Sequence, residues 1–268
     1  MTKTLVQLVG PLAGVVFALW GVLASGEHCR NRLREHERYR IAFADIDCAT
    51  PQGLTRVEFL DEVQYLASWP DNVRLLEDAV AAWLAKAFAL HPWVEEVRRV
   101  EVTSGRRVRV ELTFRTPVLM VPTRAKGDGP AGEIDYRSVD SHGVLLPRSD
   151  ADAAPGPRLL AELPCPRCRA GIVWDDQRVQ TAARTASYLR PFAEQVGIEN
   201  YDFAGGDLVL HSRTGRVVWG RAPGEERSDE ALAEVKLRRL LDGDVVPEHR
   251  ERDLRSPPDA HTRLVKSK

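Results

Sequence analysis

The sequence has little net charge and little cysteine. Its 38 basic and 39 acidic side chains leave a formal net charge of -1, so no general positive field attracts nucleic acid. Four cysteines in 268 residues are too few to build a disulfide scaffold. We therefore expect no nucleic-acid partner. A chain of this length is able to bury the cores of one or two domains.

Motifs that carry catalysis are also scarce. The seven histidines are scattered, and none pairs with an acid or a second histidine at a helical metal-binding spacing. The glycines of "AGGD" at residues 204–207 lack the lysine of a phosphate-binding loop. Asp175 and Asp176 would point apart on a helix, so we expect them to cap the helix that follows. The sequence predicts no enzyme, no metal, no cofactor and no small-molecule substrate.

Cys165 and Cys168, in "CPRC", are the strongest candidates for chemistry. A redox pair normally begins a helix after a strand, where the helix dipole lowers a thiol pKa, but these lie in an apparent loop. A structural zinc ion needs four ligands, and no second Cys or His pair stands at a suitable distance. We expect a local disulfide or inert thiols in an extracytoplasmic setting, with redox activity or metal binding as alternatives.

A run without any charge spans residues 4–26, "TLVQLVGPLAGVVFALWGVLASG". About 20 such residues cross the hydrocarbon core of a bilayer, so residues 1–26 are predicted to form a transmembrane anchor. Its candidate transmembrane residues are Leu5, Val9, Val15, Phe17, Trp20 and Leu23. A cleaved signal peptide usually has a shorter apolar region, and a buried core helix is rarely apolar on every side; both remain alternatives.

The juxtamembrane segment, residues 27–39, is rich in arginine. Arg30, Arg32, Arg34, Arg38 and Arg40 follow the apolar run, against Lys3 before it. Counted literally, these charges place the body of the protein in the cytoplasm, although large domains translocate largely regardless of nearby charge. The residues alone leave the orientation open.

Residues 40–121 are predicted to form a compact β-α-α-β-β module. A short strand covers residues 40–48, and Thr55 with Glu58 has the pattern of a helix capping box. Asp71 or Asn72 is expected to cap a second helix. The expected core stripes are Val57, Leu60, Val63 and Leu66 or Ala67, then Leu76, Val80, Trp83, Leu84, Ala87 and Leu90. A turn at Ser104-Gly105 joins two strands of alternating apolar residues.

Residues 122–255 are predicted to form a mixed β domain with flanking helices, before a polar tail at 256–268. Hairpins are expected to turn at residues 140–143 and 214–215, and a strand at residues 198–203. Helices are expected over residues 175–192 and from a cap at Ser228. The first should bury Val179, Ala182, Ala183, Ala186 and Leu189. The whole soluble part is thus expected to be α+β.

The order of these segments resembles the FtsQ/DivIB family of bacterial cell-division proteins. The resemblance is carried by "HPWVEEVRRVEV", "VRVELTFRTPV", "YRSVDSHGVLL", "DLVLHSRTGRVVWGR" and the pair Lys236-Leu237. Arg115-Thr116-Pro117 matches an Arg-x-Pro-like segment of the family. The family's Val-Asp-x-x-Gly-Val hairpin is matched by Val139, Asp140, Gly143 and Val144. The "CPRC" insertion and the arginine-rich flank depart from the family pattern.

The resemblance implies a single-pass protein of the bacterial inner membrane, with a POTRA module and an FtsQ-like β domain outside the cytoplasm. It implies a non-enzymatic scaffold that recruits other bitopic division proteins by β-strand addition. The implied edge lies after the late helix, at Val245, Val246, Asp253, Leu254 and Arg255; a frayed terminus is the alternative. The other function considered is a POTRA-containing envelope protein in outer-envelope assembly or transport.

Overall fold

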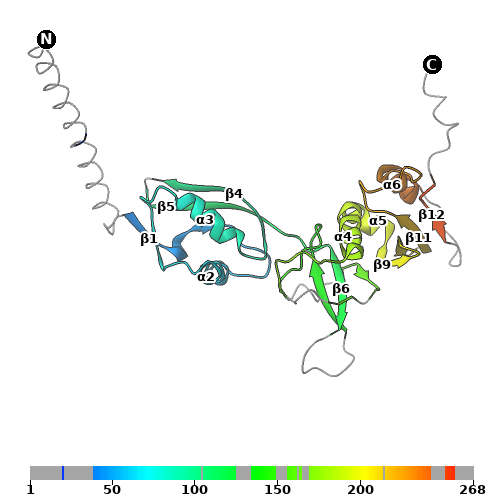
Figure 1. Cartoon of the computed structure of the whole chain (residues 1–268), viewed down its shortest axis with the longest axis horizontal. Coiled ribbons are helices and arrows are strands. Elements are labelled where there is room, and N and C mark those ends of the chain that lie inside the picture. Colours follow the sequence, from blue (N-terminus) through cyan, green and yellow to red (C-terminus); the bar gives the residue numbers. More distant parts are fainter. Residues whose placement is uncertain are drawn as a thin grey trace, which may run out of the picture. The chain divides into compact units, whose positions relative to one another are not determined.

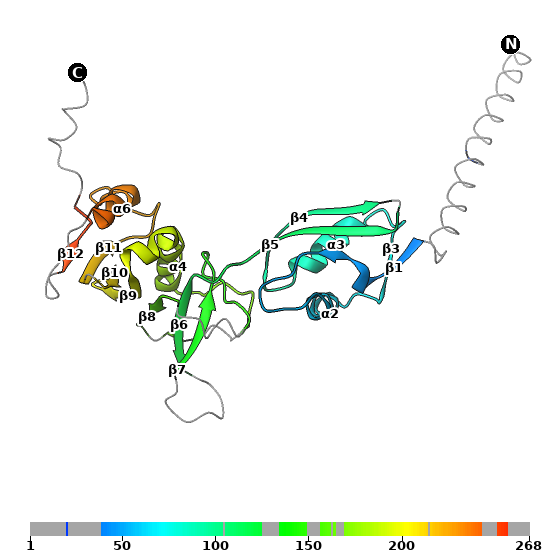
Figure 2. The same ribbon diagram turned by 180° about the vertical axis from the view of Figure 1, so that it is seen from behind.

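The computed structural model describes Trp20 and residues 39–103, 105–124, 134–148, 156–161, 163–164, 169–213, 215–242 and 251–256. The chain divides into two compact units between Thr113 and Phe114. Both units combine helices with strands (Figures 1 and 2), so the expected α+β class is confirmed.

Several expected features lie outside the described residues. They are the transmembrane anchor apart from Trp20, the pair Cys165 and Cys168, and the apolar pair Val245 and Val246. No helix within the described ranges is long and apolar enough to cross a membrane.

Within its described residues, the first unit contains two small sheets and two α-helices. Its elements are β1 (Arg40–Ala42), η2 (Phe43–Asp45), β2 (Asp47–Cys48), α2 (Arg56–Ala67), β3 (Asn72–Arg74), α3 (Val80–Ala89), β4 (Val94–Thr103) and β5 (Arg107–Phe114). One sheet has the order β2-β5-β4, with β2 parallel to β5, and the other is the antiparallel ribbon β1-β3. The expected order of strand, two helices and two strands is present with two changes: the strand expected at residues 40–48 is divided into β1, η2 and β2, and β3 is added between the helices.

The capping box and the long hairpin are confirmed. Thr55 Oγ1 accepts from the Glu58 N–H, and Glu58 Oε2 accepts from the Thr55 N–H at 2.8 Å. The turn between β4 and β5 contains Arg106 in the left-handed region at φ 58°. Val108 and Val110 of β5 are buried, as the alternation predicts.

The start of the second helix was placed wrongly. Asp71 and Asn72 cap no helix; residues 72–74 form β3 instead, and α3 begins at Val80. The competing structure is the ribbon: Val73 pairs with Ile41 and both side chains are buried. Val80, Leu84 and Ala87 of the expected core stripe are buried, but Trp83 and Leu90 are 45% and 57% exposed, and Phe88 faces the core in addition.

The second unit is built on one seven-stranded mixed sheet. Its strands are β6 (Leu119–Arg124), β7 (Ile134–Val139), β8 (Arg158–Leu159), β9 (Ile198–Ala204), β10 (Asp207–Ser212), β11 (Gly215–Gly220) and β12 (Arg252–Asp253). They lie in the order β12-β11-β10-β9-β8-β6-β7. The helical segments are α4 (Gln177–Leu189), η4 (Arg190–Phe192), α5 (Ala193–Val196) and α6 (Ala233–Leu241). The expected module end, Val121, falls inside β6 of this sheet.

Helix α4 supplies much of the core of this unit. Its inward residues are the five that the spacing predicts, Val179, Ala182, Ala183, Ala186 and Leu189, and all are buried. They share one cluster with Trp174, Tyr201 and Trp219. Asp176 caps the helix by accepting from the Arg178 N–H at 2.9 Å, whereas Asp175 is exposed and does not cap it.

The other expected elements are present with two changes. The hairpin of β10 and β11 turns between Ser212 and Gly215, as predicted. The turn at residues 140–143 is present, but its returning arm makes only isolated bridges and not a regular strand. The late helix begins at Ala233 and not after Ser228, since the intervening residues turn to place Glu230 beside Lys236.

Candidate partner-binding edge

Strand β12 lies at one edge of the seven-stranded sheet, beside β11 (Figures 1 and 2). The two strands are parallel, with Val217 opposite Arg252 and Val218 opposite Asp253. The N–H of Leu254 donates to the carbonyl of Val218 at 3.0 Å. Main-chain groups alternate along a strand, so the N–H and C=O of Asp253 face the open side. Among the residues that the structure describes, no strand pairs with this side of Asp253.

Leu254 anchors the edge strand to the core. Its side chain is 1% exposed and packs in the same cluster as Trp219 and Ala233. Of the residues predicted for partner binding, Leu254 therefore holds the strand in place, while Asp253 and Arg255 reach the surface. The structure brings these last two side chains together.

Helix α6 holds the strand from a second direction. Arg239 Nη1 donates to the carbonyls of Leu254 and Ser256, at 3.1 and 2.5 Å. Arg252 Nη2 donates in return to the carbonyl of Arg239 at 2.5 Å. The N–H of Ala231, just before the helix, donates to the carbonyl of Arg255 at 2.7 Å. The short strand is thus fixed by its flanks as well as by β11.

A buried ion pair supports the turn before α6. Lys236 Nζ lies 2.5 Å from Glu230 Oε1, and the lysine side chain is fully buried. The same ammonium lies 5.2 Å from the centre of the Trp219 ring, a cation–π distance. Glu230 also accepts from the N–H groups of Arg221 and Arg227. Burial raises the pKa of Glu230, but the hydrogen bond and positive charge of Lys236, together with the two main-chain hydrogen bonds, outweigh it, so the pKa of Glu230 is lowered.

Gly220 makes room for that carboxylate. It ends β11 with φ +91°, and a Cβ atom there would lie 2.2 Å from Glu230 Oε1 and 3.0 Å from Arg255 Cγ. Only glycine fits both the backbone conformation and the space. The glycine after an apolar strand in "VVWGR" indicates a special position in the sequence. Nothing in the sequence indicates that Glu230, ten residues later, folds back against Gly220.

Asp253 and Arg255 form a partly exposed clamp that reaches from β12 across β11 to Asp207 of β10. Arg255 Nη2 donates to Asp253 Oδ2 at 2.6 Å, and Nη1 donates to Asp207 Oδ2 at 2.5 Å. The Arg255 N–H donates to Asp253 Oδ1 at 2.9 Å. Hydrogen bonds from Arg255 lower the pKa of Asp253, and those from Asp253 raise the pKa of Arg255. The clamp keeps Asp253 ionised.

Comparison with protein-family models finds no match, and comparison with curated proteins finds no relative. The geometry of the edge therefore carries the functional argument. Within the described ranges, no three or more His, Cys, Asp or Glu side chains gather in a way that could hold a metal ion. Cys48 is a free thiol, and burial raises its pKa to about 11, which makes it a poor nucleophile.

Sequence reasoning named Asp253, Leu254 and Arg255 but missed their supports. Glu230, Gly220 and Arg239 were not singled out as site residues, and Lys236 was noted only as part of a motif. The available signals were the glycine after an apolar strand and the lysine among apolar positions of a helix. A lysine at such a position implies a buried acid nearby.

Proposed function

We propose that this chain is a non-enzymatic bitopic membrane scaffold of the FtsQ type, which recruits partners in cell division and septal envelope assembly. Residues 1–26 anchor it in the bacterial inner membrane. Residues 40–121 act as a POTRA-like module and residues 122–255 as an FtsQ-like β domain, both outside the cytoplasm. The order of strands and helices in the first unit and the mixed sheet of the second support this assignment.

The observation that carries the proposal is that β12 is hydrogen-bonded on one side and open on the other. Its inner side is held by β11, Arg239 and Ala231, while the N–H and C=O of Asp253 face outward. An edge strand with unpaired main-chain groups templates the addition of a further strand. A bitopic partner with an extended segment near the membrane would pair with this edge. Such binding depends on main-chain hydrogen bonds between the two strands and needs no catalytic group.

The test uses a substitution that removes one main-chain donor. Asp253→Pro deletes the outward N–H, which no bond to β11 uses, while Asp253→Ala removes the same side chain and keeps that N–H. A photo-crosslinking amino acid in place of Glu251 in the full-length protein, in cells, should give a crosslink to a single-pass membrane protein. Asp253→Pro should abolish it and Asp253→Ala should preserve it. Equal crosslinking in both variants would place the partner site elsewhere.

A further inference from the structure

Arginine side chains gather in the first unit, close to the point where β1 begins. Arg40 of β1 and Arg74 of β3 lie directly opposite each other in the antiparallel ribbon. The Leu75 N–H donates to the Tyr39 carbonyl at 2.9 Å, so Arg40 and Arg74 form a non-hydrogen-bonded pair, the kind in which facing side chains approach most closely. Like charges at such positions destabilise a ribbon. The two arginines therefore do not serve the stability of the ribbon.

The turn between β4 and β5 brings two more arginines to the same place. Arg106 Nη2 donates to the carbonyl of Arg40 at 2.9 Å, and both views show the turn on the same side of the first unit as β1 (Figures 1 and 2). Arg107 follows in the chain, and both side chains are exposed. Arg106 also has φ 58°, a backbone conformation in which glycine would be less strained.

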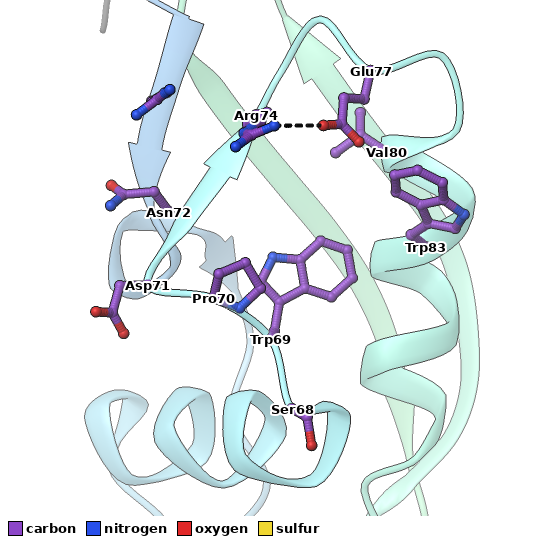
Figure 3. A pocket seen from close by; sticks show the side chains of 10 residues that line it. Ser68, Trp69, Pro70, Asp71, Asn72, Arg74, Glu77, Val80 and Trp83 are labelled. Carbon is purple, nitrogen blue, oxygen red and sulfur yellow. Dashed lines mark ion pairs between the residues drawn. The ribbon is translucent and has the colours of Figure 1, made fainter. Parts of the chain in front are cut away.

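We call residues 39–40, 74–78, 102–103 and 105–107 the basic end of the first unit. These residues carry four arginines against two acids, Glu77 and Asp78. Arg74 Nη1 lies 3.7 Å from Glu77 Oε1 (Figure 3), and the arginine side chain is 57% exposed. Water screens such a pair, which contributes little to stability. The basic end therefore has an excess of positive charge that faces solvent and attracts an anionic surface.

A hollow of about 540 Å³ lies beside these arginines, and its lining includes Tyr39, Leu75, Leu76 and Arg106. An aromatic ring and two leucine side chains are thus next to a guanidinium group. Aromatic residues are enriched at the level of lipid headgroups, and arginine places its apolar stem along apolar surface while its charged group reaches phosphate. This combination fits the interfacial region of a bilayer.

The covalent chain limits the distance between the basic end and a membrane. Tyr39 is 13 residues after Gly26, where the predicted anchor ends. A fully extended chain of that length spans at most about 45 Å. An anchored chain therefore keeps the basic end at a high effective concentration near lipid headgroups.

We propose that the basic end binds the anionic phospholipid headgroups of the membrane in which the chain is anchored. Guanidinium groups bind phosphate oxygens through paired hydrogen bonds, and each arginine near the surface adds to the electrostatic attraction. The inference rests on the anchor of the proposed function and is independent of strand addition at β12. Its effect is to hold the first unit at the bilayer surface.

The test uses the full-length protein in nanodiscs of phosphatidylcholine that contain a minor fraction of radiolabelled phosphatidylglycerol. A photo-crosslinking amino acid replaces Thr103, which is exposed at the end of β4. We expect the label to become attached to the protein. Arg74→Gln together with Arg106→Gln should lower the yield at least about 10-fold, because each arginine near an anionic surface strengthens attachment several-fold.

Arg98→Gln together with Arg99→Gln is the matched control. These two side chains are 64% and 65% exposed on β4 and lie outside the basic end, so their replacement should leave the yield unchanged. Nanodiscs in which only phosphatidylcholine is present and labelled should give a much lower yield than those with labelled phosphatidylglycerol.

Three outcomes would overturn the proposal. Equal labelling in the two double variants would show that Arg74 and Arg106 bind no lipid. Equal labelling by phosphatidylcholine alone would show contact with the membrane that does not depend on the anionic headgroup. A crosslink to a second copy of the chain in place of lipid would show that the basic end is a protein contact.

Co-elution of protein and lipid measures the anchor separately. Incorporation into the discs without labelling would leave the anchor standing and reject the lipid site. If the protein is not incorporated, the anchor of the proposed function is wrong, and co-sedimentation of the full-length protein with phosphatidylglycerol vesicles then tests the basic end alone. Co-sedimentation that is lost in Arg74→Gln with Arg106→Gln would support headgroup binding, and its absence in the wild-type protein would reject it.

Discussion

Arg115 Nη1 donates to Asp140 Oδ2 at 2.6 Å, and both side chains are largely withdrawn from solvent. The other carboxylate oxygen accepts from the N–H groups of His142 and Val144, at 2.9 and 2.8 Å. One ion pair therefore joins the Arg115-Thr116-Pro117 segment to the turn at residues 140–143. Two short motifs that are far apart in the sequence form one structural unit.

Replacing Arg115 should destabilise the second unit. Arg115→Ala leaves the Asp140 carboxylate buried with only its two main-chain donors, so we expect a loss of about 2–3 kcal/mol in unfolding free energy. Arg148→Ala breaks a pair with Asp135 that is more exposed and should cost less than about 1 kcal/mol. Hydrogen exchange of the β9–β11 amides measures both. Equal losses of unfolding free energy in the two variants would show that the burial of the Arg115–Asp140 pair does not increase its contribution to stability.

Gly220→Ala should be among the most damaging single changes in the second unit. It forces a side chain onto a residue at φ +91° and drives its Cβ into Glu230 Oε1, so we expect a loss of about 3 kcal/mol. Gly206→Ala is the matched control, since Gly206 has φ +89° with no atom within 4 Å of a built Cβ. Gly206→Ala should lower the unfolding free energy only by the cost of a side chain at positive φ, about 1 kcal/mol. Thermal unfolding of the two variants isolates the collision with Glu230.

The Lys236–Glu230 pair predicts strong non-additivity. Lys236→Met leaves an acid buried without its cation and should cost about 3–5 kcal/mol. Glu230→Gln alone should also destabilise, because it leaves the ammonium without a counter-charge. The double variant should lose much less than the sum, and a double-mutant cycle on unfolding free energy measures the coupling. Additive losses would show that the two side chains act separately.

His91 should make the first unit sensitive to acid. Its ring is fully buried, with Nε2 3.0 Å from Glu62 Oε2 and Nδ1 accepting from the Trp93 N–H. Burial lowers its pKa, and the contact with Glu62 only partly opposes this. The unfolded chain therefore binds the proton more readily than the folded chain. The resulting stability is complete above about pH 6.5, the unfolded value, and is lost as pH falls below it towards the folded pKa.

Thermal unfolding between pH 7.5 and 5 measures this dependence. His91→Gln keeps one acceptor and one donor but cannot titrate, so the melting temperature of the first unit should change less with pH in the variant. An unchanged slope would assign the acid sensitivity to other groups.

The proposed topology predicts where the carboxyl terminus lies. A reporter that is active only in the periplasm, fused after Lys268, should be active in bacterial cells. The same fusion after deletion of residues 1–26 should be inactive, because the anchor would be missing. Activity of a cytosol-only reporter at the same position would overturn both the orientation and the localisation.

Local signals in the sequence were sufficient for much of the fold. The capping box at Thr55, the spacing along α4 and the alternation in β5 each depend on residues within a few positions of one another, and all three were predicted correctly. The errors arose where distant residues compete with local preference. Val73 pairs with Ile41 in the β1–β3 ribbon, and α3 therefore begins only at Val80. No pattern within residues 71–79 predicts that pairing.

The candidate site shows the same division. Asp253 and Arg255 were named because the family that the sequence resembles has its terminal strand after the late helix, yet the burial of Leu254 depends on a core assembled from α4, β10 and β11. The acid that meets Lys236 could not be chosen from sequence, since Glu225, Glu226, Glu230 and Glu234 all lie near it along the chain. The selection of Glu230 is made by the turn at Gly220.

The fixing of β12 by Arg239, Ala231 and Leu254 has a consequence for any strand that pairs with it. The receiving edge is already ordered before binding, so the conformational entropy lost on association comes almost entirely from the incoming segment. Partners with the same contacts but different intrinsic preference for extended structure should therefore differ in affinity according to that preference. Among such partners, the one whose free segment is most extended would bind with the highest affinity.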